Sequence, residues 1–379
     1  MKIITWSLSI GLFLMVFSGP IGLRAQTLPA KAEILNVMAK TNQYFMDTWP
    51  DAGKPIFTNI ERPSNIWTRA VYYEGLMALY SIKPDKKYLD YATQWGEKHN
   101  WGLRGGIQTR NADNQACGQT YIDLYLLDKK EERIKDIKAS IDLMVQGDKK
   151  DDWHWIDALQ MAMPVFVKLG NIYKDTSYFR KMYDLYAFSK YRHGGNGLYN
   201  PVEKLWWRDK DFVPPYKEPN GANCYWSRGN GWVVAALVRT LSELPKSDPH
   251  YNEYLNDFRN MLQALPPLQR YDGYWNVSLA DPTNYGGKEL TGTALFVYGM
   301  AWGINNGLID RKTYLPVLLK AWNVMVKECV HPNGFLGYVQ GTGKEPKDGQ
   351  PVTYNSKPDF EDYGLGCFLL AGSEVYKLK

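Results

Sequence analysis

Residues 155–170, WIDALQMAMPVFVKLG, are the stretch that decides the fold. After Trp155 and Asp157 nearly every position is apolar, so a helix here has no polar face to turn toward water and lies inside the protein. One carboxylate, Asp157, stands where this helix begins, a place where Asp commonly caps the helix or interacts with its dipole. A second interpretation is a proton donor whose pKa is raised by apolar surroundings.

Five other stretches have the same character, opening on polar, glycine or tryptophan residues before an apolar helix. They are residues 67–80, 114–127, 226–244, 289–307 and 362–378. Between the apolar helices run six charged stretches with apolar residues at helical spacing, the pattern of helices with one buried face. These are residues 32–49, 85–99, 131–147, 177–192, 249–265 and 312–328.

The two kinds of helix alternate strictly along the chain, so the repeat is an outer helix, a loop and an inner helix. Separate hairpins of this kind could not bury the inner helices, whereas a closed ring can. An open solenoid is disfavoured because no terminal repeat has the polar face of a cap. The sequence therefore predicts an all-α (α/α)6 barrel, one catalytic domain over residues 26–379. The loops before the inner helices should gather at one mouth, where a concave site belongs.

The first 25 residues have the features of an export signal. Lys2 precedes an apolar run, and a small-residue cleavage site follows at Ala25. We therefore expect an exported protein, periplasmic or secreted. No later stretch approaches the roughly 20 apolar residues of a membrane helix. The net charge of +5 is spread along the chain without a basic tract. Neither a membrane nor a nucleic acid is an expected partner.

The cysteine and histidine patterns bear on disulfides and metals. The cysteines are widely spaced in apolar or aromatic segments, so free buried thiols are expected, although an oxidising compartment would permit two disulfides. The histidines are scattered and no CxxC or HExxH pattern occurs. The sequence therefore predicts no metal site and no cofactor. The cysteines are Cys117, Cys224, Cys329 and Cys367.

Two carboxylates are placed to meet at the mouth of the barrel. Asp113 precedes one inner helix and Asp157 begins the next one. Held close together in partial burial they repel as anions, so one should keep its proton near neutral pH. Asp157 is the better general acid because Trp153, Trp155 and Met161 supply an apolar wall.

Aromatic and polar side chains are expected to share the mouth with these carboxylates. A sugar needs that combination, because its C–H faces stack on rings while its hydroxyls need directed partners. Many aromatic residues also simply fill the core of a large helical protein. Within WSRGNGW, Arg228 is a candidate for a two-pronged contact with a substrate carboxylate, flanked by tryptophan platforms. The candidate substrate-binding residues are Trp67, His154, Trp155, Trp207, Trp226, Arg228 and Trp232.

At these residues the chain resembles a known group of enzymes. WIDALQMAMP, WSRGNGW, ELTGTALFVYGMAWGI and DNQACGQTY together are similar to the unsaturated glucuronyl and unsaturated rhamnogalacturonyl hydrolases. These are glycoside hydrolase families 88 and 105, and the likeness looks closer to family 105. It extends from about Trp67 to the C-terminus. The resemblance implies an (α/α)6 barrel that needs no metal or organic cofactor.

The reaction that the resemblance implies is hydration of a vinyl ether. The families remove a 4,5-unsaturated uronic acid from the non-reducing end of oligosaccharides left by polysaccharide lyases, and a rhamnogalacturonan-type substrate is favoured here. An aspartic acid protonates C4, water adds at C5 with the resulting carboxylate as base, and the hemiketal opens to release the next sugar. By this resemblance Asp157 is the acid. The other residues that match family motifs are Trp155, Asp113, Trp226, Arg228 and Trp232.

One departure from the family concerns substrate recognition. A histidine that follows a Gly-Leu-aromatic turn in better-known members has no match in GLYNPVEKLWWRD, residues 197–209. Lys204, Trp206, Trp207 or Arg208 can take its place, and His193 is a weaker candidate. The sugar next to the uronate is therefore left open.

Three rival functions fit parts of the sequence. A conventional glycosidase would use Asp113 and Asp157 as acid and base on saturated glycosides. A sugar epimerase would want a pair of histidines at the mouth, where only His154 is expected. A non-catalytic glycan-binding protein would keep the tryptophans and tolerate Asp157→Asn.

Overall fold

The structure is a computed structural model that describes residues 27–379. The export signal expected over residues 1–25 lies outside the described residues. Within them, no helix is long and apolar enough to cross a membrane.

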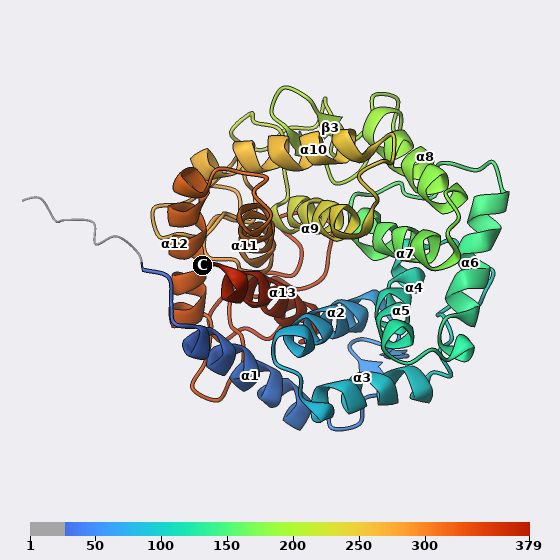
Figure 1. The fold of residues 1–379 in the computed structure, drawn as a ribbon. Helices are drawn as coiled ribbons and strands as arrows, with labels where there is room; N and C mark the ends of the chain where they lie inside the picture. Colours follow the sequence, from blue (N-terminus) through green and yellow to red (C-terminus); the bar gives the residue numbers. More distant parts are fainter. Residues whose placement is uncertain (1–26) are drawn as a thin grey trace, which may run out of the picture.

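A ring of inner helices surrounds the barrel axis, and a second ring of helices covers it on the outside (Figure 1). The inner helices are α2 (Trp67–Ile82), α5 (Cys117–Leu127), α7 (Asp157–Tyr173), α9 (Ser227–Glu243), α11 (Leu290–Asn305) and α13 (Tyr363–Lys377). The outer helices are α1 (Lys31–Thr48), α3 (Lys86–Lys98), α6 (Lys135–Gln146), α8 (Ser177–Tyr191), α10 (Tyr251–Ala264) and α12 (Arg311–Glu328).

The inner ring is closed. Each inner helix packs against the next in chain order, and the last one, α13, packs against the first, α2. At this seam the backbones touch: a Cβ on Gly366 of α13 would lie 2.2 Å from the carbonyl oxygen of Val71 on α2. The predicted all-α (α/α)6 barrel is confirmed.

Burial explains which helices form which ring. Every residue of α11 from Leu290 to Gly303 is buried, as its unbroken apolar sequence requires. The outer helix α3 instead buries one face, which includes Tyr88, Tyr91 and Trp95, and turns its charged residues to solvent. The two sequence patterns thus separate the layers correctly. The expectation of free buried thiols is also confirmed for all the cysteines.

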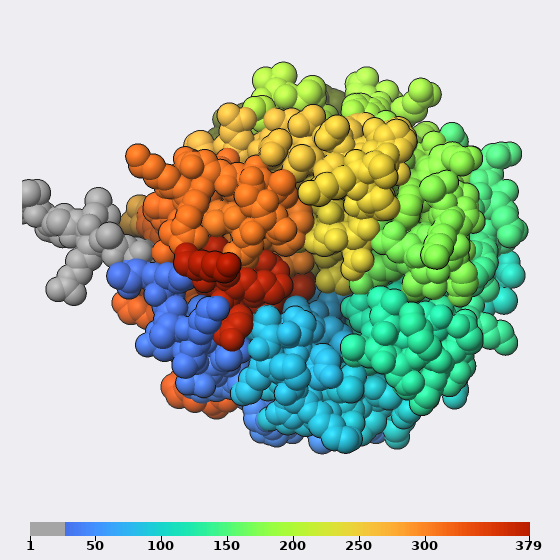
Figure 2. Space-filling model, in the orientation of Figure 1, coloured from blue at the N-terminus to red at the C-terminus, as the bar shows by residue number. Residues whose placement is uncertain are grey.

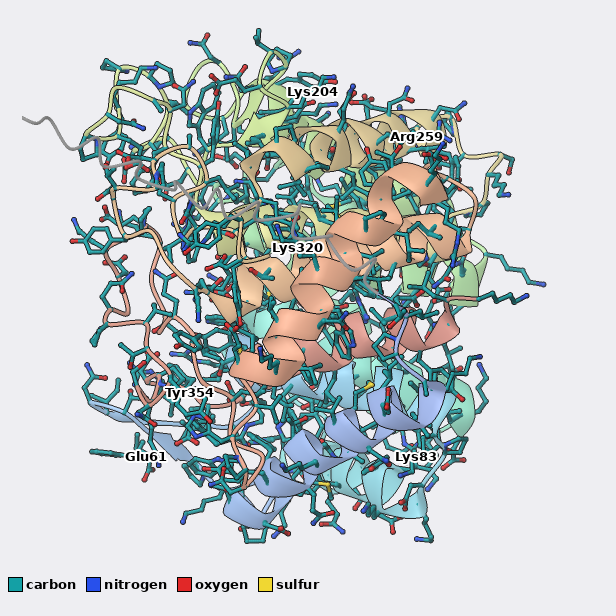
Figure 3. The ribbon with its side chains drawn as sticks, turned by 90° about the vertical axis from the view of Figure 1, so that its left-hand side faces the viewer. Glu61, Lys83, Lys204, Arg259, Lys320 and Tyr354 are labelled. Atoms are coloured by element: carbon teal, nitrogen blue, oxygen red, sulfur yellow. The ribbon has the colours of Figure 1, made fainter. Side chains whose placement is uncertain are left out.

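The segments before the inner helices gather on one side of the ring. Glu61 and Tyr354, in the segments before α2 and α13, lie on that side, whereas Lys83, just after α2, lies on the other (Figure 3). Short elements that the sequence did not predict occur in the connecting segments, and the expected inner helix over 114–127 is interrupted at Ala116. These short elements are β1 (Ile56–Phe57), β2 (Glu61–Arg62), α4 (Ala112–Gln115), η1 (Glu131–Arg133), β3 (Tyr199–Asn200), β4 (Leu205–Trp206) and η2 (Pro266–Leu268).

Candidate functional site

Asp157 is the first residue of α7, and backbone contacts fix its position. The N–H of Ile156 donates to the carbonyl of Arg208 at 3.0 Å, and Trp155 pairs with Asp209 in an isolated antiparallel bridge. The segment after β4 therefore lies along the start of α7 and is hydrogen-bonded to it. Since Ile156 is the N-cap residue, Asp157 does not serve as the cap.

The carboxyl group of Asp157 is buried and incompletely paired. The residue is 8% exposed, and its Oδ2 has no hydrogen-bond partner. The Nε of Arg208 lies 3.4 Å from this oxygen. Burial raises the pKa of Asp157, while the positive charges of Arg208 and Arg228 act in the opposite direction. Trp153 and Met161, which the sequence predicts as an apolar wall for Asp157, are both fully buried; their contact with the carboxyl group stays a prediction.

Asp113 is the second carboxylate of the mouth, and it lies in the short helix α4. Its backbone N–H donates to the side chain of Asn111 at 2.9 Å, which caps this helix. Burial and then the negative charge of Asp157 raise the pKa of Asp113 to about 7, against the opposing charges of Arg208 and Arg104. The structure thus brings the two predicted carboxylates into electrostatic contact. Their catalytic roles stay predictions.

Arg208 lies directly against this pair. Its Nη1 donates to Asp209 Oδ2 at 2.6 Å, and Asp209 Oδ1 accepts the backbone N–H of Asp211 at 2.9 Å. The side chain of Arg208 remains 20% exposed, so a ligand can reach it from solvent. Among the proposed replacements for the family histidine, Lys204 instead bonds Gln263 at 2.6 Å and Trp206 is fully buried.

Arg228 does not offer the free fork expected from the sequence. It is 1% exposed, and its Nη1 and Nη2 donate to the backbone carbonyls of Gln340 and Gly341, each at 2.8 Å. The rings of Trp226 and Tyr363 lie 4.5 and 5.1 Å from the guanidinium. Both terminal nitrogens of Arg228 hold the loop before α13, so the two-pronged contact is not free in this structure. A substrate contact of Arg228 stays a prediction.

Trp226 and Trp232 are likewise not open platforms. They are 1% and 0% exposed, and a ring without a free face cannot stack on a sugar. Trp226 instead donates from Nε1 to Gln340 Oε1 at 3.0 Å. Trp67 is half-buried and meets Trp232 edge-on, with ring centroids 6.3 Å apart. Of these three tryptophans, Trp67 alone keeps an accessible ring.

The remaining aromatic candidates are neighbours in sequence of Asp157 or Arg208. Trp155 and Trp207 are 6% and 8% exposed, and the indole N–H of Trp207 is buried without a partner. His154 is exposed, with its ring centroid 4.5 Å from that of Trp155 and 6.1 Å from that of His193. Their contact with substrate is a prediction.

Gln340 is a residue that the sequence reasoning missed. Its side chain accepts from Trp226 and donates to the carbonyl of Asp348 at 2.6 Å, while its own carbonyl accepts from Arg228 and from the hydroxyl of Tyr363. It is fully buried in a segment without regular structure. No periodic pattern or motif marks such a residue, because its partners come from distant parts of the chain.

A cavity of about 990 Å³ lies at the opposite end of the barrel, lined by the last turns of the inner helices. That face is the one seen in Figure 2, where the surface is hollowed near its centre. Its charged groups neutralise one another: Lys168 Nζ lies 2.5 Å from Asp123 Oδ1, and Arg239 Nε lies 3.8 Å from Glu74 Oε2. The cavity is thus not at the mouth, and we place the candidate site on the Asp113 and Asp157 carboxylates.

Metal chemistry has no ligand set in the described part of the chain, since residues 27–379 contain no group of three or more His, Cys, Asp or Glu side chains that could hold an ion.

A family model described as Glycosyl Hydrolase Family 88 matches residues 37–379, which is most of the chain. The chain belongs to this family. The finer expectation that this family 88 chain lies closer to family 105 stays a prediction.

Family 88 membership agrees with the individual relatives. A protein of Formosa agariphila named unsaturated 3S-rhamnoglycuronyl hydrolase is 33% identical over 335 residues, 83% of this chain and 85% of that protein. A solved family 88 structure from Bacteroides vulgatus is 32% identical with a TM-score of 0.83, covering 92% of this chain and 100% of that one. A solved structure described as a polysaccharide lyase has the same identity and TM-score and covers 92% of this chain and 98% of that one.

Proposed function

We propose that this family 88 protein removes a 4,5-unsaturated uronic acid from the non-reducing end of lyase-generated oligosaccharides by hydrating the double bond. The observation that carries the proposal is the pair of raised-pKa carboxylates, Asp113 and Asp157, beside the accessible Arg208. A relative that shares a third of its residues over most of both chains is named for this kind of reaction.

The proposed reaction needs a proton donor, water and a proton acceptor, but no metal. The Asp157 O–H bond breaks as a C–H bond forms at C4, and positive charge develops at C5 and its ring oxygen. Water adds at C5 while the Asp157 carboxylate takes one of its protons, which restores the acid. The hemiketal at C5 then opens, and the hemiacetal left at C1 releases the next sugar.

Asp113 supports this cycle by competing for the same proton. Two carboxylates that interact strongly titrate as a pair, so the pair as a whole holds a proton near neutral pH. The Asp113 pKa of about 7 is consistent with such sharing. A proton is therefore present at the mouth at a pH where an ordinary carboxyl group would have lost it.

For the sugar after the uronate we propose rhamnose. The relative's name contains a rhamnoglycuronyl group, and the rhamnogalacturonan-type substrates favoured from the sequence also place rhamnose next to the uronate. We further propose that the protein acts outside the cytoplasm, periplasmic or secreted, on the basis of the leader-like residues 1–25.

The test is an assay of the mature chain with a panel of lyase-generated oligosaccharides that differ in the second sugar. We expect the ultraviolet absorbance of the conjugated double bond to fall, fastest when the second sugar is rhamnose. Saturated oligosaccharides of the same composition serve as controls and should be left intact. Cleavage of the saturated controls with no change in absorbance would identify a conventional glycosidase instead.

A second candidate is a lyase reaction, favoured by the 32% identity to a solved structure described as a polysaccharide lyase. A lyase removes a proton from C5 of a saturated uronate and creates the double bond. The same assay separates the two reactions by sign, because a lyase makes the absorbance of the saturated controls rise.

A further inference from the structure

Arg208 and Asp157 face each other with complementary atoms that do not complete a hydrogen bond. Arg208 Nε and Asp157 Oδ2 are 3.4 Å apart, and both atoms are buried without a hydrogen-bond partner. Buried polar groups are nearly always satisfied, so an unsatisfied pair calls for an explanation. At the mouth of a barrel, the explanation that fits is a ligand that supplies the missing partner.

We infer that Arg208 binds the carboxylate of the substrate's uronic acid, and that sharing its charge with this carboxylate strengthens the hold of Asp157 on the proton that it donates. The inference rests on the proposed function. It adds which residue recognises the uronate, and it adds that substrate binding favours the protonated form of Asp157.

The geometry of Arg208 suits this role. Asp209 accepts a hydrogen bond from Nη1 at 2.6 Å and itself accepts one from the backbone N–H of Asp211, so one end of the guanidinium is held in place. Its backbone carbonyl is tied to Ile156 at the start of α7. The side chain is still 20% exposed. A planar and accessible guanidinium that is held at one end is well suited to a carboxylate.

Arg228, the alternative cation, is unavailable for this purpose. Both of its terminal nitrogens donate hydrogen bonds to the backbone carbonyls of Gln340 and Gly341, and the residue is 1% exposed. A uronate carboxylate could bind there only if the loop before α13 were released.

The charges around Asp157 explain why substrate binding would favour its protonated form. Asp157 faces Arg208 and Asp209 from the segment after β4, Arg228 from α9 and Asp113 from α4, while the exposed Arg104 faces Asp113. In the free protein Arg208 favours the ionised form of Asp157. A bound uronate adds one negative charge and takes a share of Arg208, so the two aspartates hold a proton more tightly in the complex. That proton comes from solvent, passes from Asp157 to C4, and is replaced from the added water.

Sharing of Arg208 also gives selectivity for acidic sugars. A substrate whose carboxylate is converted to its methyl ester brings no negative charge, so Arg208 keeps its full effect on Asp157, and the aspartate pair holds its proton less tightly than with the uronate bound. The ester should therefore lose turnover as well as binding.

The experiment is a comparison of the pH dependence of kcat, which reports the bound complex, with that of kcat/KM, which reports the free protein. The account predicts that the alkaline limb of kcat lies at higher pH than that of kcat/KM in the wild type. In Arg208→Gln the free protein has lost the cation, so its kcat/KM limb should move up in pH. In Arg208→Lys the charge stays and the fork is lost, so the limb should stay in place while KM rises at least about tenfold.

The outcomes separate the inference from the proposed function. Arg180→Gln, an exposed change on α8, is the control and should behave as the wild type. Coincident limbs for kcat and kcat/KM in an active wild type would overturn the inference while leaving the hydrolase function in place. Unchanged kinetics of Arg208→Gln would overturn it as well. Absence of any reaction with every unsaturated uronide would instead overturn the proposed function.

Discussion

Arg228 on α9 donates a hydrogen bond of 2.8 Å to the backbone carbonyl of Gln340, in the loop that leads to α13. This bond joins two inner helices that are not neighbours in the ring through a segment without regular structure. Arg228, which the sequence predicts as a substrate ligand, therefore holds the loop before α13 in place at the mouth of the barrel.

Arg228→Lys tests this fastening. An ammonium group cannot reach two carbonyls with the geometry of a planar fork, so one buried carbonyl loses its partner. We expect a loss of about 1–3 kcal/mol in unfolding free energy and a higher KM, measured by denaturant unfolding and steady-state kinetics. Arg180→Lys on the exposed face of α8 is the matched control. Wild-type stability would contradict the fastening role.

Asp157→Asn tests the general acid. The amide keeps the shape of the side chain and cannot deliver a proton, so turnover should fall by roughly two to four orders of magnitude. Binding of an unsaturated disaccharide, measured by calorimetry, should largely survive. Asp151→Asn, an exposed neighbour in sequence, should leave turnover unchanged. A normal rate of absorbance loss in Asp157→Asn would remove this residue from the chemistry.

Glu74→Gln tests the buried carboxyl group at the other end of the barrel. Burial raises the pKa of Glu74 to about 7 from its ordinary value of 4.5. Between these pH values the Glu74 carboxyl group is ionised in the unfolded chain but still protonated in the folded protein. The free energy of unfolding therefore falls as the pH rises from 4.5 to 7. The loss is on the order of 3 kcal/mol at most.

The Tm of the wild type should therefore be higher at pH 5 than at pH 8, by a margin that Glu74→Gln narrows. Glu61→Gln in the exposed strand β2 is the control for a general change in net charge. An equal pH dependence of Tm in wild type and Glu74→Gln would show that Glu74 does not titrate as described.

The barrel could be predicted from the sequence because its two layers have different local patterns. The unbroken apolar run of α11 and the one-sided pattern of α3 each determine burial without knowledge of the rest of the chain. Asp113 and Asp157 could be predicted to meet because both stand near the start of adjacent inner helices. The order of helices around a closed ring then fixes their proximity.

The detailed contacts of the mouth could not be predicted in the same way. Arg228 and Trp226 are buried because Gln340 folds back onto them from more than a hundred residues away. Arg208 gains its importance from a backbone bond between its carbonyl and Ile156. Neither relationship leaves a periodic trace in the sequence. The position of Arg228 between two tryptophans therefore predicts a ligand-binding side chain, whereas the structure has contacts within the protein there.

The most direct test of the central claim is to run the reaction in D₂O and follow the released uronate by NMR at early times. The account predicts one deuterium at C4, delivered to a single face by Asp157. The product incubated alone under the same conditions corrects for slow exchange next to the new carbonyl group. Release of the sugar with no deuterium at C4 would contradict this mechanism.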